Sequence, residues 1–256
     1  MLTNAEILRV AMAQSAIESC CAPEDFFKEE NVVALSRESA GRRAYLAEPY
    51  AFDLTSYGKN VVACVREDLQ EVALSYLAKY SAAHSFETPA LHALDGMLAP
   101  FGLKTKYQAE YFLPRIENMR GYGCPFDLCV LQPRDFAGLY GKKWSNALCE
   151  QRKQLDMLCV GAFHHQTLAA LAGASADCET MWQIGVDVLP AYRGRGLAKA
   201  VTSRLAAEVL ARGKVPFYCA AWSNLPSVRN ALACGFYPAW VQLTAKPAEK
   251  IPLTKG

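Results

Sequence analysis

The residues best suited to chemistry lie in the glycine-rich stretch 190–199, where an expected strand leads into an expected helix. Gly194 and Gly196 stand in this turn, and Arg193 and Arg195 place positive charge beside them. The first N–H groups of a helix have no acceptor within the helix, and the helix dipole favours an anion at that end. Because glycine has no Cβ to hold a phosphate away from these amides, we expect the turn to bind a phosphate-bearing ligand.

The sequence on either side of the turn predicts the two elements that hold it. Residues 181–189 alternate in hydrophobicity and are rich in β-branched and aromatic side chains, which predicts a buried strand. Pro190 ends that strand, because proline has no N–H to donate to a sheet. Residues 197–212 place apolar side chains on one helical face, and Gly213 stands where a helix is commonly capped.

The spacing of the glycines excludes two common phosphate-binding loops. A Walker loop requires Gly-x-x-x-x-Gly-Lys-Ser/Thr, and the chain contains no such run. The dinucleotide fingerprint requires a third glycine three residues after Gly196, where Lys199 stands. The pattern that fits is Arg-x-x-Gly-x-Ala, formed by Arg193, Gly196 and Ala198. This pattern resembles the pyrophosphate loop of the GNAT superfamily of acetyl-CoA-dependent N-acetyltransferases.

A second motif follows in the order that the resemblance implies. Residues 215–222 predict another strand, and Asn224 stands at the start of the helix expected after it. In the family a Gly-Phe pair follows this asparagine, and Gly235 and Phe236 stand at the family's separation of eleven residues. Because the two motifs occur in this order and on these elements, about half of the chain is similar to a GNAT domain.

The resemblance implies where acetyl-CoA would bind. The amides of residues 193–198 would hold its pyrophosphate, and the main chain of residues 186–188 would pair with the pantetheine arm like an added strand. This arrangement requires the strands at 181–189 and 215–222 to separate. Asn224 would reach the pantetheine or the thioester, although an asparagine there is equally a good helix cap. The expected cofactor-binding residues are Val186, Asp187, Val188, Arg193, Gly194, Arg195, Gly196, Leu197, Ala198, Asn224 and Ser227.

Acetyl transfer to an amine requires a neutral amine and, for the departing thiolate, a proton donor or nearby amides. In many members of the family, a glutamate five residues before the asparagine removes the proton, and a tyrosine seven residues after it donates one. These positions hold Cys219 and Ala231 here, so the usual residues are missing. The candidate catalytic substitutes are Glu179, Asp187 and Tyr218, with Asp177 and Tyr237 as further options.

Each candidate also has a structural interpretation that the sequence leaves open. Asp187 could cap a turn or pair with Arg193. Glu179 could be a turn residue, and Tyr218 could belong to the core. Cys219 could carry an acyl group, although a cysteine buried in a strand is normally inert. The sequence has no Cys-x-x-Cys pair and no histidine spacing typical of zinc sites, so we expect no metal site.

The expected fold class is α/β with mixed (α+β) character, in two domains. Residues 121–256 are expected to form a GNAT-type central mixed sheet flanked by helices, and residues 1–120 a smaller N-terminal α/β domain without a cofactor motif. The order strand, helix, helix, glycine, strand over residues 60–113 echoes the C-terminal half, so a degenerate half-GNAT is one alternative for this domain. The triplet 66–68 carries acid where an anion loop needs glycine, so this domain should not bind the cofactor.

Further elements are expected at intervals along the chain. In the N-terminal half, periodicity and turn residues predict helices at 4–20, at 69–80 and from Thr88, and strands at 60–65 and 106–113, with no clear pattern over 24–50. In the C-terminal half, we expect strands at 126–132, 157–163, 167–172 and 236–245, two short helices within 134–152 and a helix at 225–234.

Composition limits the compartment and the partners. The 256 residues are 52% hydrophobic with a net charge of +2, and the lack of a basic face argues against nucleic acid as a partner. The ten cysteines lie mostly in apolar runs, where free cysteine behaves as a small core residue. The N-terminus lacks an apolar signal segment, and no apolar stretch reaches the length of about eighteen residues needed for a membrane span. We therefore expect a cytoplasmic protein that binds no membrane, and the sequence is compatible with a homodimer.

The leading hypothesis is an N-acetyltransferase that transfers an acetyl group from acetyl-CoA to a primary amine of an unknown small molecule or peptide. The alternative is a catalytically weak CoA-binding sensor or regulatory module, because the usual glutamate and tyrosine are missing. Both hypotheses predict CoA binding, but only the first predicts release of the free thiol. The segments that would shape the acceptor site carry no recognised motif, so the sequence does not identify the acceptor.

Overall fold

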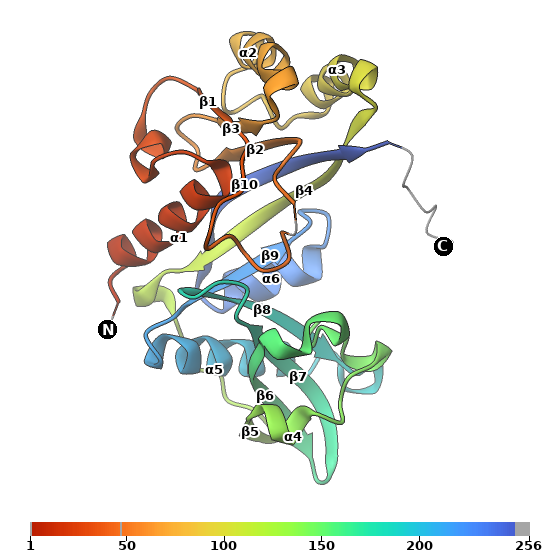
Figure 1. The fold of residues 1–256 in the computed structure, drawn as a ribbon. Coiled ribbons are helices and arrows are strands. Elements are labelled where there is room, and N and C mark those ends of the chain that lie inside the picture. Colours follow the sequence, from red (N-terminus) through yellow and green to blue (C-terminus); the bar gives the residue numbers. More distant parts are fainter. Residues whose placement is uncertain (1, 47, 249–256) are drawn as a thin grey trace. The chain divides into compact units, whose positions relative to one another are not determined.

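The chain folds into two compact units, which the computed structural model describes over residues 2–46 and 48–248 (Figure 1). Unit 1 comprises Met1–Ala11 and Tyr111–Ala239, and unit 2 comprises Met12–Glu110 and Trp240–Gly256. Each unit therefore draws on two separate stretches of the sequence. The first helix and two long strands contain residues of both units.

Helices and strands alternate along much of the chain, as in a mixed α/β fold. The helices are α1 (Asn4–Ser19), α2 (Gln70–Lys79), α3 (Thr88–Leu98), α4 (Pro133–Phe136), α5 (Leu197–Ala211) and α6 (Leu225–Ala233). The strands are β1 (Val32–Leu35), β2 (Phe52–Ser56), β3 (Val62–Val65), β4 (Leu103–Pro114), β5 (Asp127–Leu131), β6 (Asp156–His164), β7 (Thr167–Ser175), β8 (Met181–Val188), β9 (Val215–Ala220) and β10 (Phe236–Pro247). Short 3₁₀ turns lead into several of these elements, among them Pro190–Tyr192 before α5.

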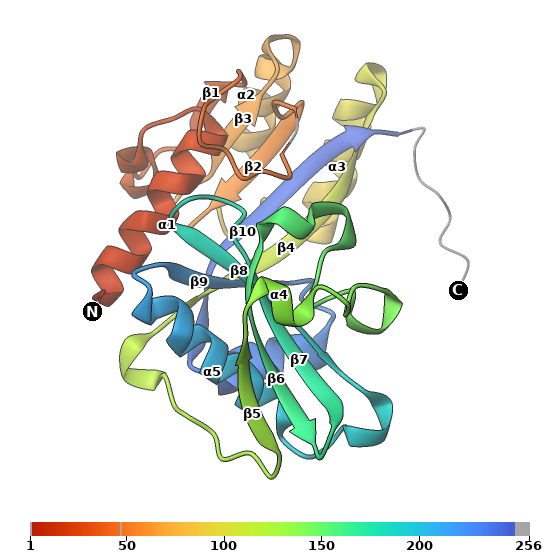
Figure 2. The same cartoon turned by 60° about the horizontal axis from the view of Figure 1, so that its bottom comes forward.

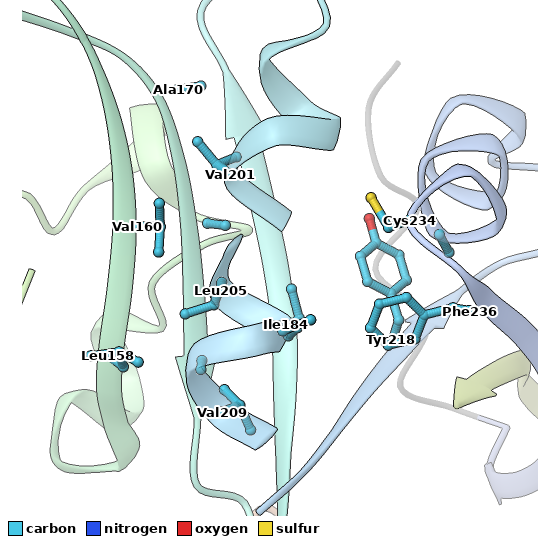
Figure 3. Close-up of a cluster of buried hydrophobic side chains, with 14 of the residues drawn as sticks. Leu158, Val160, Ala170, Ile184, Val201, Leu205, Val209, Tyr218, Cys234 and Phe236 are labelled. Atoms are coloured by element: carbon cyan, nitrogen blue, oxygen red, sulfur yellow. The ribbon is translucent and has the colours of Figure 1, made fainter. Parts of the chain in front are cut away.

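Unit 1 contains a mixed sheet in which β5, β6, β7 and β8 are antiparallel neighbours and β9 runs parallel to β8. The hairpin expected from the sequence is formed by β6 and β7, with Val160 opposite Ala172. Helix α5 packs on this sheet through Val201, Leu205 and Val209, which are fully buried (Figure 3). Their spacing of four residues places them on one helical face, so the apolar face predicted from the sequence is the face that packs on the sheet.

Alternate residues of β6 and β7 face opposite sides of the sheet, and a different segment covers each side (Figure 2). Leu158 and Val160 belong to a buried cluster with α5. Cys159 and Leu171 belong to another cluster, with α4 and the segment 142–149. Because both faces are covered, these strands are apolar on both sides, as is usual for strands buried in this way.

Unit 2 contains a second run of strands in the order β1, β3, β2, β10. Strand β1 is parallel to β3, and β2 is antiparallel to both β3 and β10. The helices α2 and α3 cover this sheet, and they bury Ala73, Tyr76 and Leu94 against Leu54 and Val65. Unit 2 therefore has a hydrophobic core of its own.

The predicted fold class is confirmed: the protein has a mixed α/β fold with a mixed sheet and flanking helices. The expected helices and strands of the N-terminal half are found as α1, β3, α2, α3 and β4. The segment 24–50, which has no clear sequence pattern, contains β1, a strand that is only half-buried. Strand β2 was also missed. Over residues 2–46 and 48–248, no helix combines the length and the apolar character needed to cross a bilayer.

A buried polar cluster joins β2 to β10 in unit 2. Asp53 is fully buried, and its carboxylate accepts hydrogen bonds from Gln242 Nε2 at 3.0 and 3.1 Å and from Thr244 Oγ1 at 2.5 Å. Arg43 forms a buried ion pair with Glu18 and donates to Gln242 Oε1 at 3.2 Å. Burial raises the pKa of Asp53 to about 7, although the hydrogen bonds to its carboxylate oppose that shift.

Replacing Asp53 with asparagine should remove a pH-dependent contribution to stability. The pKa of this carboxyl is about 7 in the folded protein against an ordinary value of 3.8, so the folded state binds the proton more tightly. Its contribution to the free energy of unfolding is therefore largest below about pH 4 and falls as the pH rises towards 7. We expect the stability advantage of wild type over Asp53→Asn, measured by urea unfolding, to fall by a few kcal/mol over that interval. A difference that is constant or grows with pH would contradict this expectation.

Candidate functional site

The two central strands of unit 1 separate part of the way along their length. The parallel ladder between β8 and β9 runs from Met181, opposite Val215, to Ile184, opposite Tyr218. Strand β8 then continues to Val188, paired with β7 and without a partner from β9 in the described part of the chain. The structure thus has the separation of the two strands that the resemblance requires. We call the space between the separated strands the gap.

The open edge of β8 presents backbone hydrogen-bonding groups to the gap. The Leu189 N–H donates to the Ala169 carbonyl oxygen at 3.0 Å, and hydrogen-bonded pairs alternate along an antiparallel ladder. Val186 and Val188 therefore direct their N–H and C=O groups away from β7. The carbonyl oxygen of Val188 accepts a hydrogen bond from Arg193 Nε at 3.3 Å. The backbone of Val186 and the N–H of Val188 thus remain to pair with a ligand.

The glycine-rich turn follows directly after β8 and is exposed. After the 3₁₀ turn Pro190–Tyr192, the residues Arg193, Gly194, Arg195 and Gly196 all lie at the surface. Gly194 and Gly196 have φ angles of +77° and +78°, in the left-handed region that favours glycine. A Cβ at either glycine would meet no described atom within 4 Å, so the turn is not packed against its own protein.

No side chain among the described residues caps the start of helix α5. Gly196 is the N-cap residue, and it offers no side-chain acceptor to the amides that follow. The N–H groups of residues 197–199 have no acceptor within the helix, so they point outward from its start. The Arg195 guanidinium lies 5.8 Å from the ring centroid of Tyr192, which holds positive charge beside the turn. The turn and the helix start together form an exposed anion site, and its residues fit a diphosphate.

On the β9 side of the gap, Asn224 caps helix α6. Its Oδ1 accepts a hydrogen bond from the Ser227 N–H at 3.4 Å, so the capping role that the sequence left open is observed. The Ser227 hydroxyl is hydrogen-bonded in turn to the Tyr218 hydroxyl, at 2.9 Å. These contacts bring three of the predicted site residues together at the start of α6.

Tyr218 stands at the point where the strands begin to separate. It is the last β9 residue of the ladder with β8, and its ring is buried near Cys234 and Phe236 (Figure 3). Burial raises the pKa of Tyr218, and its hydrogen bond with Ser227 opposes that shift. The phenol therefore keeps its proton at neutral pH, and it is suited to donate a proton.

The structure gives the Asp187 side chain a positioning role. Its Oδ2 accepts hydrogen bonds from the backbone N–H groups of Asn146 and Ala147, both at 2.9 Å. Its Oδ1 accepts from the side-chain amide of Asn146 at 2.6 Å. Beside it, a Cβ on Gly185 would lie 1.8 Å from the Asn146 carbonyl oxygen, so glycine is what allows this close approach. Asp187 thereby fixes the segment 142–149 on β8.

Glu179 and Asp177 precede the first residue of β8, at the end away from the gap. The side chain of Glu179 is exposed, and about 20 Å of strand separates it from the gap at 3.3 Å per residue. Asp177 is buried, where it pairs with Arg152 at 3.5 Å and accepts from the Ser175 hydroxyl at 3.0 Å. The structure therefore does not bring either carboxylate to Tyr218.

Two further candidates from the sequence have less specific surroundings. Tyr237 is half-buried, and the Arg115 guanidinium lies 4.9 Å from its ring centroid. Burial raises the pKa of Tyr237, so this phenol is also protonated at neutral pH. Cys219 is half-buried on β9, one residue past the ladder with β8.

The sequence predicted short helices within 134–152, but it did not predict that the segment 142–149 packs directly on one face of β7 and β8. Its backbone lies directly against two glycines of these strands. Gly185 contacts Asn146 in this way, and Gly173 contacts Ala147, whose carbonyl oxygen would lie only 1.9 Å from a Cβ on Gly173. Glycines inside strands often mark the close approach of another backbone. Gly173 and Gly185 were therefore a signal that the sequence contained.

The match to a known protein family lies in unit 1. Residues 116–239 match a protein-family model described as GNAT acetyltransferase, and this range falls within Tyr111–Ala239 of that unit. No curated protein matches the chain.

Several solved structures are similar to larger parts of the chain. A GNAT-family protein from Novosphingobium aromaticivorans DSM 12444 has 22% identity and a TM-score of 0.42, over 56% of this chain and 66% of that one. An acetyltransferase of the GNAT family from Colwellia psychrerythraea has 15% identity and a TM-score of 0.45, over 73% and 77%. A GCN5-related N-acetyltransferase-like protein from Streptococcus suis 89/1591 has 17% identity and a TM-score of 0.48, over 94% and 98%. The chain thus spans just under two thirds of the Novosphingobium protein.

Replacing Asp187 with alanine should loosen the segment 142–149. The change leaves two backbone amides without their charged acceptor, and we expect it to lower the free energy of unfolding by about 2 kcal/mol in urea titrations. Limited proteolysis should then cleave within this segment. Asp127→Ala, on exposed β5, is the matched control and should leave both measurements near wild type. An Asp187→Ala protein as stable and as resistant as wild type would rule out the positioning role.

Proposed function

We propose that this chain, which belongs to the GNAT acetyltransferase family through residues 116–239, transfers an acetyl group from acetyl-CoA to a primary amine of a small molecule or peptide. The observation that carries the proposal is the gap: β8 continues to Val188 beyond the last pair with β9 and leads to an exposed, uncapped helix start. Such a gap suits an extended ligand with an anionic group at the helix. The family match supports acetyl-CoA as that ligand.

The residues around the gap suit the successive parts of acetyl-CoA. The backbone of Val186 and Val188 would pair with the pantetheine arm, as an added strand pairs with a sheet edge. The amides of residues 193–198 would hold the diphosphate, and Arg193 and Arg195 add charge beside it. On the opposite side, the start of α6 with its capping Asn224 would line the gap.

Acetyl-CoA would supply the acetyl group as a reactive thioester. We assign Tyr218 as the proton donor to the departing thiolate, because its phenol is protonated and stands where the strands separate. The Asp187 carboxylate is already held by the segment 142–149. Glu179 lies about 20 Å of strand away from the gap, so we assign it no part in the transfer. Among the three predicted catalytic residues, we therefore assign proton donation to Tyr218 and a positioning role to Asp187.

Binding of CoA and release of thiol together distinguish a transferase from a CoA-binding sensor or regulatory module. Calorimetry should show that the full chain binds CoA. Free thiol should then be released from acetyl-CoA in the presence of at least one member of a panel of small amines and peptide N-termini. Binding without release for every amine would favour the sensor, and the absence of binding would overturn the proposal.

Replacing Gly196 with aspartate should abolish CoA binding. The new carboxylate would stand at the anion site and repel the diphosphate, and its Cβ would obstruct the approach to the amides. We expect the Kd for CoA, measured by calorimetry, to rise roughly 100-fold or more.

Gly213→Asp is the matched control for this change. Gly213 has a φ of +71°, has no described atom within 4 Å of a Cβ, and lies just past the other end of α5. The control therefore introduces the same residue in the same backbone conformation, away from the anion site. It should leave the Kd within about twofold of wild type. An unchanged Kd for Gly196→Asp would overturn the assignment of the turn.

Replacing Tyr218 with phenylalanine should slow thiol release without weakening CoA binding. Phenylalanine keeps the ring in the core but removes the proton donor, so kcat should fall by about 100-fold. Tyr237→Phe is the control, because it removes the phenol of the other tyrosine considered as a donor, which lies half-buried beside Arg115. Its kcat should stay much closer to that of wild type. If Tyr218→Phe turns over as fast as wild type, the phenol is not the donor.

A further inference from the structure

One large aromatic side chain of unit 1 lies in solvent instead of in the core. The side chain of Trp222 is 70% exposed, whereas the three other tryptophans of the chain are at most 8% exposed. Trp222 belongs to a tight turn that the Asn224 N–H closes by donating to the Ala221 carbonyl oxygen at 2.8 Å. A side chain at the tip of such a turn stays at the surface, so the indole is available for contact.

Trp222 stands at the end of the central strands at which the gap opens. Ile184 and Tyr218 form the last pair of the ladder. Strand β9 ends at Ala220, and Trp222 stands two residues further on, in the turn that leads to α6. The carboxyl ends of neighbouring parallel strands open onto one crevice, which is where ligands of open α/β sheets bind. Trp222 thus follows β9 at the same end of the sheet at which the anion turn follows β8.

Two exposed neighbours extend the surface from Trp222 along α6. Leu225, in the first turn of the helix, is 51% exposed and adds apolar area. Arg229 is exposed one helical turn later, and residues four apart share a helical face. Among residues 2–46 and 48–248, no carboxylate lies within 4.0 Å of the Arg229 guanidinium. The surface therefore combines an aromatic ring with a cation that has no ion-pair partner in those residues.

We propose that Trp222 stacks on the adenine base of acetyl-CoA and that Arg229 pairs with the phosphate on its ribose. The proposal rests on the proposed function, since it requires CoA in the gap. With the diphosphate at residues 193–198, the adenosine part extends outward from the gap, at the end of the sheet where Trp222 stands. Aromatic side chains bind nucleobases by stacking, and the base would cover indole surface that now faces water. The guanidinium would add a charge-assisted contact to phosphate.

Calorimetry with two related ligands separates the two contacts. CoA and 3′-dephospho-CoA share the adenine, but only CoA carries the ribose phosphate. Trp222→Ala should weaken the binding of both ligands about 10-fold, and Trp222→Phe should restore most of the affinity because it keeps an aromatic face. Arg229→Ala should weaken CoA several-fold and leave 3′-dephospho-CoA unchanged. Leu232→Ala is the matched control, since Leu232 is 48% exposed further along α6 and should affect neither ligand.

Iodide quenching of tryptophan fluorescence provides a second readout that does not depend on turnover. Because the other tryptophans are buried, iodide reports mainly on Trp222. Saturating CoA should protect the fluorescence of the wild-type chain from iodide, and Trp222→Phe should abolish the component that CoA protects.

The outcomes distinguish this proposal from the function on which it rests. If wild type binds CoA but Trp222→Ala binds it equally well, or if CoA leaves iodide quenching unchanged, adenine stacking is overturned and the proposed function stands. A loss of affinity in Leu232→Ala as large as that in Trp222→Ala would also overturn it, because the effect would then come from disturbance of α6. If wild type binds no CoA, the proposed function itself fails.

Discussion

The site depends on the early end of the ladder between β8 and β9, which contains four residue pairs. Backbone N–H and C=O groups must be paired or solvated, so strands that lie side by side normally stay paired. Here β8 continues along β7 to Val188, while β9 turns away after Ala220 to begin α6. The open edge of β8 must therefore meet water or a ligand. The exposed helix start beyond that edge makes an anionic ligand the favoured one.

Contacts on its other sides hold β8 in place where β9 is absent. Strand β7 pairs along one edge, and α5 packs on one face. On the other face, Gly173 and Gly185 admit the segment 142–149, and Asp187 accepts three hydrogen bonds from it. A carboxylate in an apolar strand suggests catalysis, but here it satisfies the amides of an irregular segment that would otherwise lie unpaired on the sheet. These contacts hold β8 in place although its edge toward the gap is unpaired.

Local features of the site could be predicted from the sequence, because turn and cap residues act on their immediate neighbours. The glycine turn before α5 and the capping Asn224 are of this kind. The role of Asp187 could not be predicted, since its partners Asn146 and Ala147 lie 41 and 40 residues away in a segment without periodicity. Strand β1 was missed for a related reason: it is short and half-exposed, and its pairing with β3 bridges thirty residues of sequence. Such non-local contacts leave little trace in local pattern.

Unit 2 is assembled from the two ends of the chain, and this has a consequence during synthesis. Strand β2 acquires its neighbour β10, and Asp53 its contacts to Gln242 and Thr244, only after Trp240 has left the ribosome. Translation of the residues between Glu110 and Trp240 takes on the order of ten seconds. Throughout that interval β2 is paired with β3 on one edge only, and its other edge is a template for pairing with another nascent chain. The protein is therefore most prone to aggregate just before its last strand is made.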